Sequence, residues 1–305
     1  MRITSGHFSS TMLHALQKSN DKVGDLMAQI SSGSRIQRPS DDPIAAVRLL
    51  MLDRDNTMLS QYRSNIGALS IRMQQNESRL DGMLKTVNES YDLMTWAIDG
   101  SNSSEDLNAM AGTLQTLKDN LLSEVNARDN DGNYLFSGTL TNTPAVSYDP
   151  NAPLGQRYSF TGNTDRQQVV IGQGITASAN VSGDDIEDIL NQLDNALALL
   201  QDPNVDINDP ATNATLTAAQ QAMSYGISLI SGKIAGLGGA QNTLDLMDQN
   251  HAAMEVSNGQ AAEMIAGLDY AEAYDRLNNY TVAVQGSYQI YGKIMQLSPY
   301  DVILR

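Results

Sequence analysis

The 305-residue sequence contains no cysteine. Disulfide bonds, thiolate metal sites and cysteine nucleophiles are therefore excluded. Aromatic residues are also scarce, at 5% of the chain, and they consist of twelve tyrosines, three phenylalanines and one tryptophan. Methionine is frequent, with fourteen copies. The length is enough for a buried core and roughly two domains.

Basic residues and long apolar runs are in short supply as well. The chain has 19 Lys and Arg residues and 35 Asp and Glu residues, which gives a formal net charge of −16. Nucleic acids and anionic membranes both require clustered basic residues, so neither is expected as a partner. No apolar stretch is long enough to span a bilayer, and the first residues lack the apolar segment of a secretory signal peptide. These absences alone predict a soluble cytoplasmic protein.

The sequence also lacks a complete catalytic or metal-binding motif. His7, His14 and His251 share no metal-ligand spacing. Three segments approach the pattern of a P-loop, a dinucleotide-binding turn and a calcium loop, and each fails at a required position: 226–234, 172–183 and 127–132. We therefore expect no enzymatic activity, no cofactor and no bound metal.

What the sequence does contain is a matched pair of apolar stripes at its two ends. Both have the alternating spacing of three and four residues that is typical of a coiled coil. The first stripe consists of Met12, Leu16, Ser19, Val23, Leu26 and Ile30, and the second of Tyr274, Leu277, Thr281, Val284, Tyr288, Tyr291 and Met295.

The charges of the two ends are complementary. Residues 1–80 carry ten basic and seven acidic side chains, whereas residues 234–305 carry three basic and eight acidic ones. Opposite charge and matching stripes predict that the N-terminal helix lies beside the C-terminal helix. The alternative is that both are ordinary core helices of a bundle.

A loop and a very long helix follow the first stripe. Gly33 is predicted to end the first helix as a C′ glycine, and Asp42 and Pro43 to begin the next one as N-cap and first helical residue. No proline follows until residue 144, and residues 43–99 are predicted to form one helix about 85 Å long. We therefore expect an elongated, mainly α-helical molecule with long antiparallel helices.

The middle of the chain has a different composition. From Tyr134 to Val181, prolines, glycines and Thr, Val and Tyr dominate. Segments 157–161 and 166–171 flank a Gly-Asn-Thr-Asp turn, which predicts a β-hairpin. Helices are predicted around this region, with capping boxes at 103–106 and 182–185, an Asp209-Pro210 start, and a kink at the glycines of 236–239.

These elements predict five segments. They are 1–42, the N-terminal helix and loop of a terminal coiled-coil domain; 43–133, the first part of a rod domain; 134–182, a small inserted β-rich subdomain; 183–267, the second part of the rod domain; and 268–305, the C-terminal helix of the terminal coiled-coil domain.

Residues 26–36 read LMAQISSGSRI and are followed by PSDDP at 39–43. This block, carried by Gly33, Arg35, Asp41, Asp42 and Pro43, resembles the N-terminal signature of the flagellin family of bacterial flagellar axial proteins. Ser34 stands where the family has a basic residue. At the C-terminus, Ser257, the LDYAEA of 268–273 and Leu297-Ser298 are also similar to the family, but Pro299-Tyr300 replaces its closing Leu-Leu, which puts the geometry of the last turn in doubt.

Four features resemble the members at the junction of hook and filament more than filament flagellin. They are the opening Met1-Arg2-Ile3, the PSDDP form of the loop, the DGNYLFSG of residues 131–138, and a single short β insert. The alternative within the family is a short flagellin that forms the filament itself. A cytoplasmic helical scaffold or binding module is the more distant alternative.

The resemblance implies a structural role in the flagellum and revises the expected location to extracellular. Family members are exported unfolded through the flagellar type III export apparatus with the help of an export chaperone, and without a cleaved signal peptide. The implied partners are further copies of the chain, the first hook-associated protein and flagellin. A single narrow seam is too thin to stabilise an isolated pair of helices. The terminal segments are therefore predicted to gain their order on assembly.

Overall fold

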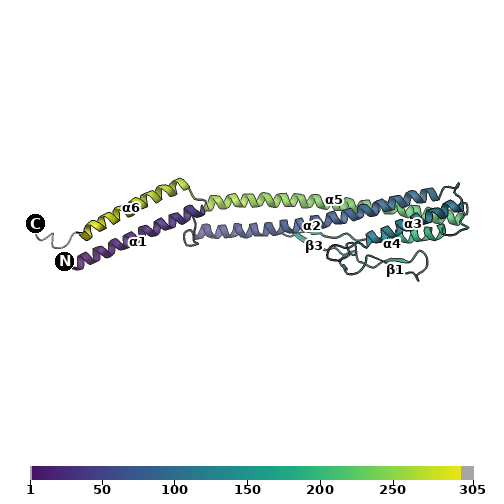
Figure 1. Cartoon of the computed structure of the whole chain (residues 1–305), viewed down its shortest axis with the longest axis horizontal. Coiled ribbons are helices and arrows are strands. Elements are labelled where there is room, and N and C mark those ends of the chain that lie inside the picture. Colours follow the sequence, from purple (N-terminus) through teal and green to yellow (C-terminus); the bar gives the residue numbers. More distant parts are fainter. Residues whose placement is uncertain (1, 297–305) are drawn as a thin grey trace. The chain divides into compact units, whose positions relative to one another are not determined.

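The computed structural model describes residues 2–296, which form six helices and two small antiparallel sheets (Figure 1). This confirms the mainly α-helical class with a small β insert. The helices are α1 (Arg2–Ser32), α2 (Pro43–Ala97), α3 (Ser104–Val125), α4 (Ile186–Leu200), α5 (Pro210–Ala266) and α6 (Tyr270–Gln296). The strands are β1 (Val146–Tyr148), β2 (Tyr158–Phe160), β3 (Gln168–Gly172) and β4 (Ile175–Ser178). No helix within residues 2–296 has both the length and the apolar character that crossing a bilayer would need.

The chain divides into two compact units. Residues 1–58 and 253–305 make up the first, here called the terminal unit, and residues 59–252 make up the second, the central unit. The division falls inside the two longest helices, so α2 and α5 each contribute to both units. The loops around residues 42 and 267 lie within the terminal unit.

Helix ends follow local sequence signals. Gly33 has φ +72° and its N–H donates to the carbonyl of Gln29 (2.8 Å), as expected of a C′ glycine. At the start of α2, Asp42 Oδ1 accepts the N–H of Ala45 (3.1 Å). Ser103 and Asp106 form the predicted capping box of α3. These caps fix where the long helices begin and end.

The hydrophobic core lies in the central unit. It is built from α2, α3, α4 and α5, together with residues of the β-rich region and of the loop before α5, and extends in sequence from Ile66 to Leu244. α2 and α5 run antiparallel there, because Arg63 pairs with Asp248 (2.8 Å) at one end and Thr95 bonds Gln220 (2.9 Å) at the other. Each fully buried aliphatic side chain contributes about 1.5–3 kcal/mol. The central unit therefore buries enough apolar side chains to fold by itself.

The two sheets differ from the predicted hairpin. Segments 157–161 and 166–171 do contain strands, β2 and β3, but β2 pairs with β1 and β3 pairs with β4. The predicted pairing is wrong because the two-residue turn Gln173-Gly174, with Gly174 at φ +71°, closes β3 onto β4. Gly162, in the predicted turn, instead packs against the backbone of Ser137. A Cβ added to Gly162 would lie only 2.8 Å from the Cα of Ser137.

The capping box predicted at 182–185 is absent. The Ser182 hydroxyl donates to Asp184 instead (2.5 Å), and α4 begins after Asp185, which has φ +68° and makes no side-chain cap bond. α5 runs unbroken through the glycines of 236–239, where a kink was predicted. Leu237 and Leu244 are buried along this stretch, and their packing outweighs the poor helix propensity of glycine.

Candidate functional site

The predicted stripe of α1 lies on one face of that helix. Leu16 and Leu26 are buried, with exposed fractions of 4% and 8%, and Met12, Val23 and Ile30 are half-buried. α1 lies against α6, as the matching stripes predicted. Hydrogen bonds that cross between the two helices join Lys22 Nζ and Asn20 Nδ2 to tyrosine hydroxyls of α6 at 3.2 and 3.3 Å.

The stripe of α6 matches the predicted one in part. Leu277, Val284 and Tyr291 are half-buried, as predicted. Thr281, also predicted for the stripe, is half-buried as well, and Ala273 (3% exposed) and half-buried Tyr280 join it. Tyr274 and Tyr288, predicted for the seam, are 57% and 53% exposed. The hydroxyl group of Tyr288 nevertheless accepts a hydrogen bond from Asn20 of α1 (3.3 Å), so Tyr288 lies at the edge of the seam. Met295 belongs to α6, but its side chain lies outside the described residues.

The loop between α1 and α2, residues 33–42, contacts the end of α5. Arg35 is its centre: its backbone N–H donates to the carbonyl of Ala266 (2.7 Å), and its guanidinium donates to the carbonyl of Ile265 (3.1 Å) and to Asp42 Oδ2 (3.3 Å). A β-bridge pairs Ser34 with Gly267. Arg35 thus connects the start of α2 to the end of α5.

Two adjacent carboxylates shape the same loop. Asp41 accepts the backbone N–H groups of Gln37 (3.0 Å) and Arg38 (2.8 Å). Asp42 caps α2, and its bond from the N–H of Ala45, together with Arg35, lowers the pKa of its carboxyl group. Both side chains are therefore held by structural bonds, and Pro43 follows as the first residue of α2.

The terminal unit exposes an apolar face that sequence reasoning did not identify. On α2, Ile44, Val47, Leu50 and Met51 are between 52% and 70% exposed. The opposite face of the same helix turns inward, with Ala45 at 7% exposure. On α5, three further apolar side chains are exposed by 56% to 84%: Met254, Val256 and Met264. We call the four residues of α2, which share one side of that helix, the outer apolar face.

The two units differ sharply in burial. All residues of the hydrophobic core belong to the central unit. In the described part of the terminal unit, the fully buried apolar residues are Leu16, Leu26, Ala45 and Ala273. Large exposed apolar patches on a protein mark interaction sites. The terminal unit is therefore the candidate functional surface.

The central unit carries buried charges instead. Lys118 Nζ lies 2.7 Å from Asp194 Oδ1, and their side chains are 6% and 4% exposed. Arg157 reaches the other oxygen of Asp194 at 3.3 Å. Burial alone would lower the pKa of Lys118. The hydrogen bond to Asp194 and the negative charge of Asp194 outweigh this effect, so the pKa of Lys118 is raised. Burial also raises the pKa of Tyr158, whose ring lies near Lys118.

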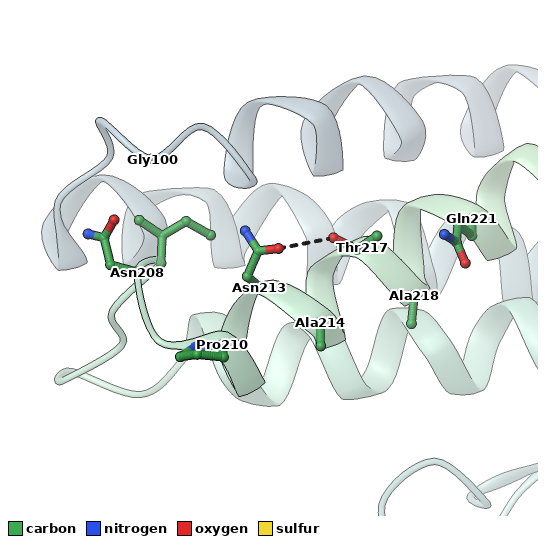
Figure 2. Close-up of a pocket in the computed structure, with 9 residues that line it drawn as sticks. Gly100, Asn208, Pro210, Asn213, Ala214, Thr217, Ala218 and Gln221 are labelled. Atoms are coloured by element: carbon green, nitrogen blue, oxygen red, sulfur yellow. Dashed lines mark hydrogen bonds between the residues drawn. The ribbon is translucent and has the colours of Figure 1, made fainter.

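A hollow with a volume of 690 Å³ lies where the loop before α5 meets the first turns of that helix. Figure 2 shows the residues that line it. Its wall consists of Gly100, Ile207, Asn208, Pro210, Asn213, Ala214, Thr217, Ala218 and Gln221, and the hydroxyl of Thr217 contacts Asn213 Oδ1 (3.4 Å). None of these side chains titrates, so the hollow offers no acid, base or nucleophile of the usual catalytic kinds.

The motifs weighed in the sequence have structural roles here. His251 is buried, and its Nε2 bonds the carbonyl of Ile171 in β3 (2.7 Å). Asp129 accepts the N–H groups of Asp131 and Asn133 and closes a turn at Gly132, which has φ +84°. Among the described residues, no three His, Asp or Glu side chains gather in a geometry that could hold a metal ion.

Comparison with known proteins places this architecture. Residues 3–141 match the model of the bacterial flagellin N-terminal helical region. Flagellar hook-associated protein 3 of Escherichia coli K12 is 26% identical over 289 residues, covering 90% of each chain. The protein of the same name from Salmonella typhimurium is 24% identical over 319 residues, covering 99% of each chain. The chain is thus similar to flagellar hook-associated protein 3 over nearly its whole length, and its N-terminal part is similar to that of flagellin.

Solved structures of hook-associated proteins share the fold. A putative flagellar hook-associated protein from Vibrio parahaemolyticus is 29% identical, with a TM-score of 0.67 over 74% of this chain and 99% of its own. The flagellar junction protein FlgL of Legionella pneumophila is 13% identical, with a TM-score of 0.60 over 71% of this chain and 100% of its own. This chain therefore shares its fold with these proteins at low sequence identity.

Proposed function

We propose that this chain is a structural subunit of the bacterial flagellum that assembles at the junction between hook and filament. Its relatives are named for the flagellar hook and, in one solved case, for the junction. In this proposal the chain forms no catalytic site. It contacts further copies of itself, the first hook-associated protein on one side and flagellin on the other.

One observation carries the proposal: the terminal unit has apolar surface but almost no core. The four side chains of the outer apolar face on α2 remain mostly in water in the single chain, as do Met254, Val256 and Met264 of α5. Covering each of them by a neighbour would contribute roughly 1–2 kcal/mol, a large part of the value for full burial. A ring of subunits supplies such neighbours on both sides of every copy. A scaffold that works as a single chain would have no neighbour to cover these side chains.

The seam between α1 and α6 supports the same proposal. Two helices with three buried apolar residues, Leu16, Leu26 and Ala273, are marginal by themselves, since most helix stability in proteins comes from tertiary packing. Assembly would then stabilise the seam residues Met12, Leu16, Val23, Leu26 and Ile30 of α1 together with Leu277, Val284 and Tyr291 of α6. Exposed Tyr274 would face a neighbouring subunit.

The route to the junction is part of the proposal. The chain would leave the cell unfolded through the flagellar type III export apparatus, escorted by an export chaperone and without loss of a signal peptide. A chain without cysteine cannot be locked by disulfide bonds during such transport. The location would then be extracellular.

Electron microscopy with a labelled antibody tests this function. The expected result is label at one position, the distal end of the hook, in cells whose own gene is replaced by one for this chain. Label along the whole filament would identify a short flagellin instead. Label confined to the cytoplasm, in cells with normal filaments, would refute a flagellar role.

A further inference from the structure

We propose that the pocket between α3, α4 and the β1–β2 sheet binds a neutral saccharide of one or two rings. The pocket has a volume of 290 Å³ and lies entirely within the central unit. Its wall combines a charged base with an aromatic side, formed by Lys118, Asp194, Arg157, Tyr148 and Tyr158. This site is independent of the outer apolar face and of the proposed assembly role.

The base of the pocket holds charges whose presence packing alone does not explain. Lys118 and Asp194 are both more than nine-tenths buried and lie 2.7 Å apart. Removing two charges from water is costly, and apolar residues of similar size often stabilise a protein as well or better. A buried pair at the wall of a cavity is more readily explained as a set of oriented polar groups that face a ligand.

The charge balance of the pocket indicates a neutral ligand. Lys118 and Arg157 supply two positive charges, and Asp194 and Asp119 supply two negative ones. Asp194 already contacts both cations, at 2.7 and 3.3 Å. An anion would meet the two carboxylates, and a cation would meet Lys118 and Arg157. A ligand that carries hydroxyl groups and no charge avoids both conflicts.

The aromatic side indicates a ring with an apolar face. Tyr148 and Tyr158 lie with their ring centroids 5.0 Å apart and their planes at 37°. Tyr158 forms the inner part and is 5% exposed, whereas Tyr148 is 47% exposed at the rim. Tyrosine combines a large apolar face with a polar hydroxyl group. The C–H face of a pyranose can pack on such a surface while its hydroxyl groups turn to polar side chains.

Hydrogen-bonding capacity remains at the rim. An arginine has five N–H donors, and within residues 2–296 the guanidinium of Arg157 bonds only Asp194 and the carbonyl of Ala152. The side chains of Tyr148 and Gln201, which also line the pocket, form no hydrogen bond with the part of the chain that the structure describes. These groups can donate to and accept from sugar hydroxyls.

Ligand-observed NMR on the purified full-length chain tests the proposal. The probes are methyl glucoside and methyl N-acetylglucosaminide, which are neutral, methyl glucuronate, which is an anion, and glucosamine, which is a cation. We expect at least one neutral probe to bind saturably in the millimolar range, the affinity typical of a ligand of about a dozen heavy atoms. Binding to neither neutral probe, or only to a charged one, would overturn the assignment.

Two variants locate the binding. Tyr148→Ala removes the rim of the aromatic side and should weaken binding at least tenfold, and Gln201→Ala should weaken it several-fold. Tyr225→Ala is the matched control, because Tyr225 is a 56% exposed tyrosine of α5 that does not line the pocket. Circular dichroism must show that all three variants remain folded. Equal loss of binding in Tyr225→Ala, or full binding in Tyr148→Ala, would refute the site.

Discussion

Replacing Met51 by Asp should separate assembly from folding. Met51 is 60% exposed on α2, so in the single chain the new carboxylate would remain in water. The change in helix propensity costs about 0.5 kcal/mol, and substitutions at exposed positions mostly stay within about ±0.5 kcal/mol. We therefore expect the thermal unfolding midpoint of the monomer to fall by no more than about 2 °C.

In the assembled state the same substitution should be severe. A neighbour that covers Met51 removes most of the side chain from water, worth about 1–2 kcal/mol. An unpaired carboxylate loses this contribution and adds a desolvation cost of about 2 kcal/mol or more. The sum of about 3–4 kcal/mol corresponds to a loss of roughly 100- to 1000-fold in affinity for each contact. Val47→Asp, on the same face, should behave alike.

Two measurements check this prediction. Circular dichroism at 222 nm follows unfolding of the monomer, and immunoblotting of sheared flagella measures incorporation in a strain without its own copy. Thr57→Asp is the control, since Thr57 is an exposed polar residue of the same helix and should incorporate normally. Met83→Asp, at a core position with 1% exposure, should unfold the monomer. The reasoning fails if Met51→Asp lowers the midpoint as much as Met83→Asp, or if it incorporates like the control.

Three further substitutions address the central unit and the loop. Lys118→Met should lower the free energy of unfolding by about 3–5 kcal/mol in urea denaturation because Asp194 loses its buried partner, and Lys118→Met with Asp194→Leu should recover most of this loss; equal instability of the double variant would contradict it. Burial raises the pKa of Asp184, but hydrogen bonds from Lys233 and Ser182 outweigh it and lower the pKa below 3.8, so the stability that its carboxylate contributes is present above pH 3.8 and is lost as the pH falls through the lower folded value. Asp184→Asn should accordingly be less stable than the parent chain at pH 7, with a difference that shrinks below pH 3.8; a difference that grew on acidification would refute the assignment. Gly33→Ala should destabilise the terminal unit by about 1–2 kcal/mol, because Gly33 has φ +72° and a Cβ would lie 3.0 Å from the Tyr270 hydroxyl; proteolysis should then cut near residue 33 faster than in a Gly24→Ala control, which has no such contact.

The sequence predicted those features that depend on neighbours along the chain. The caps at Asp42 and Ser103 and the C′ position of Gly33 are local signals, and the structure has all three. The stripe of α1 was also readable, because its apolar residues fit a single phase. For α6, the predicted stripe matches only in part, because contact with α1 decides which side chains turn inward.

Features that depend on distant contacts could not be predicted. The strand partners of β2 and β3 are set by long-range packing, such as that of Gly162 against Ser137. The outer apolar face could not be predicted from the sequence for a similar reason. Ile44, Val47 and Met51 were recognised as apolar positions of a long helix, but the pattern does not reveal that the side of Ala45 is buried while these three stay in water.

The contacts of α1 with α6 also determine the order in which the chain can fold. Asn20 and Tyr288, which meet there, are 268 residues apart in the sequence, whereas Lys118 and Asp194 of the central unit are separated by 76. Closing a longer loop costs more chain entropy, and proteins dominated by such distant contacts fold more slowly. Any process that delivers the chain from its N-terminus must release nearly all of it before α6 becomes available to α1. The central unit can therefore fold before α6 is available to α1, and the pair of α1 and α6 forms last.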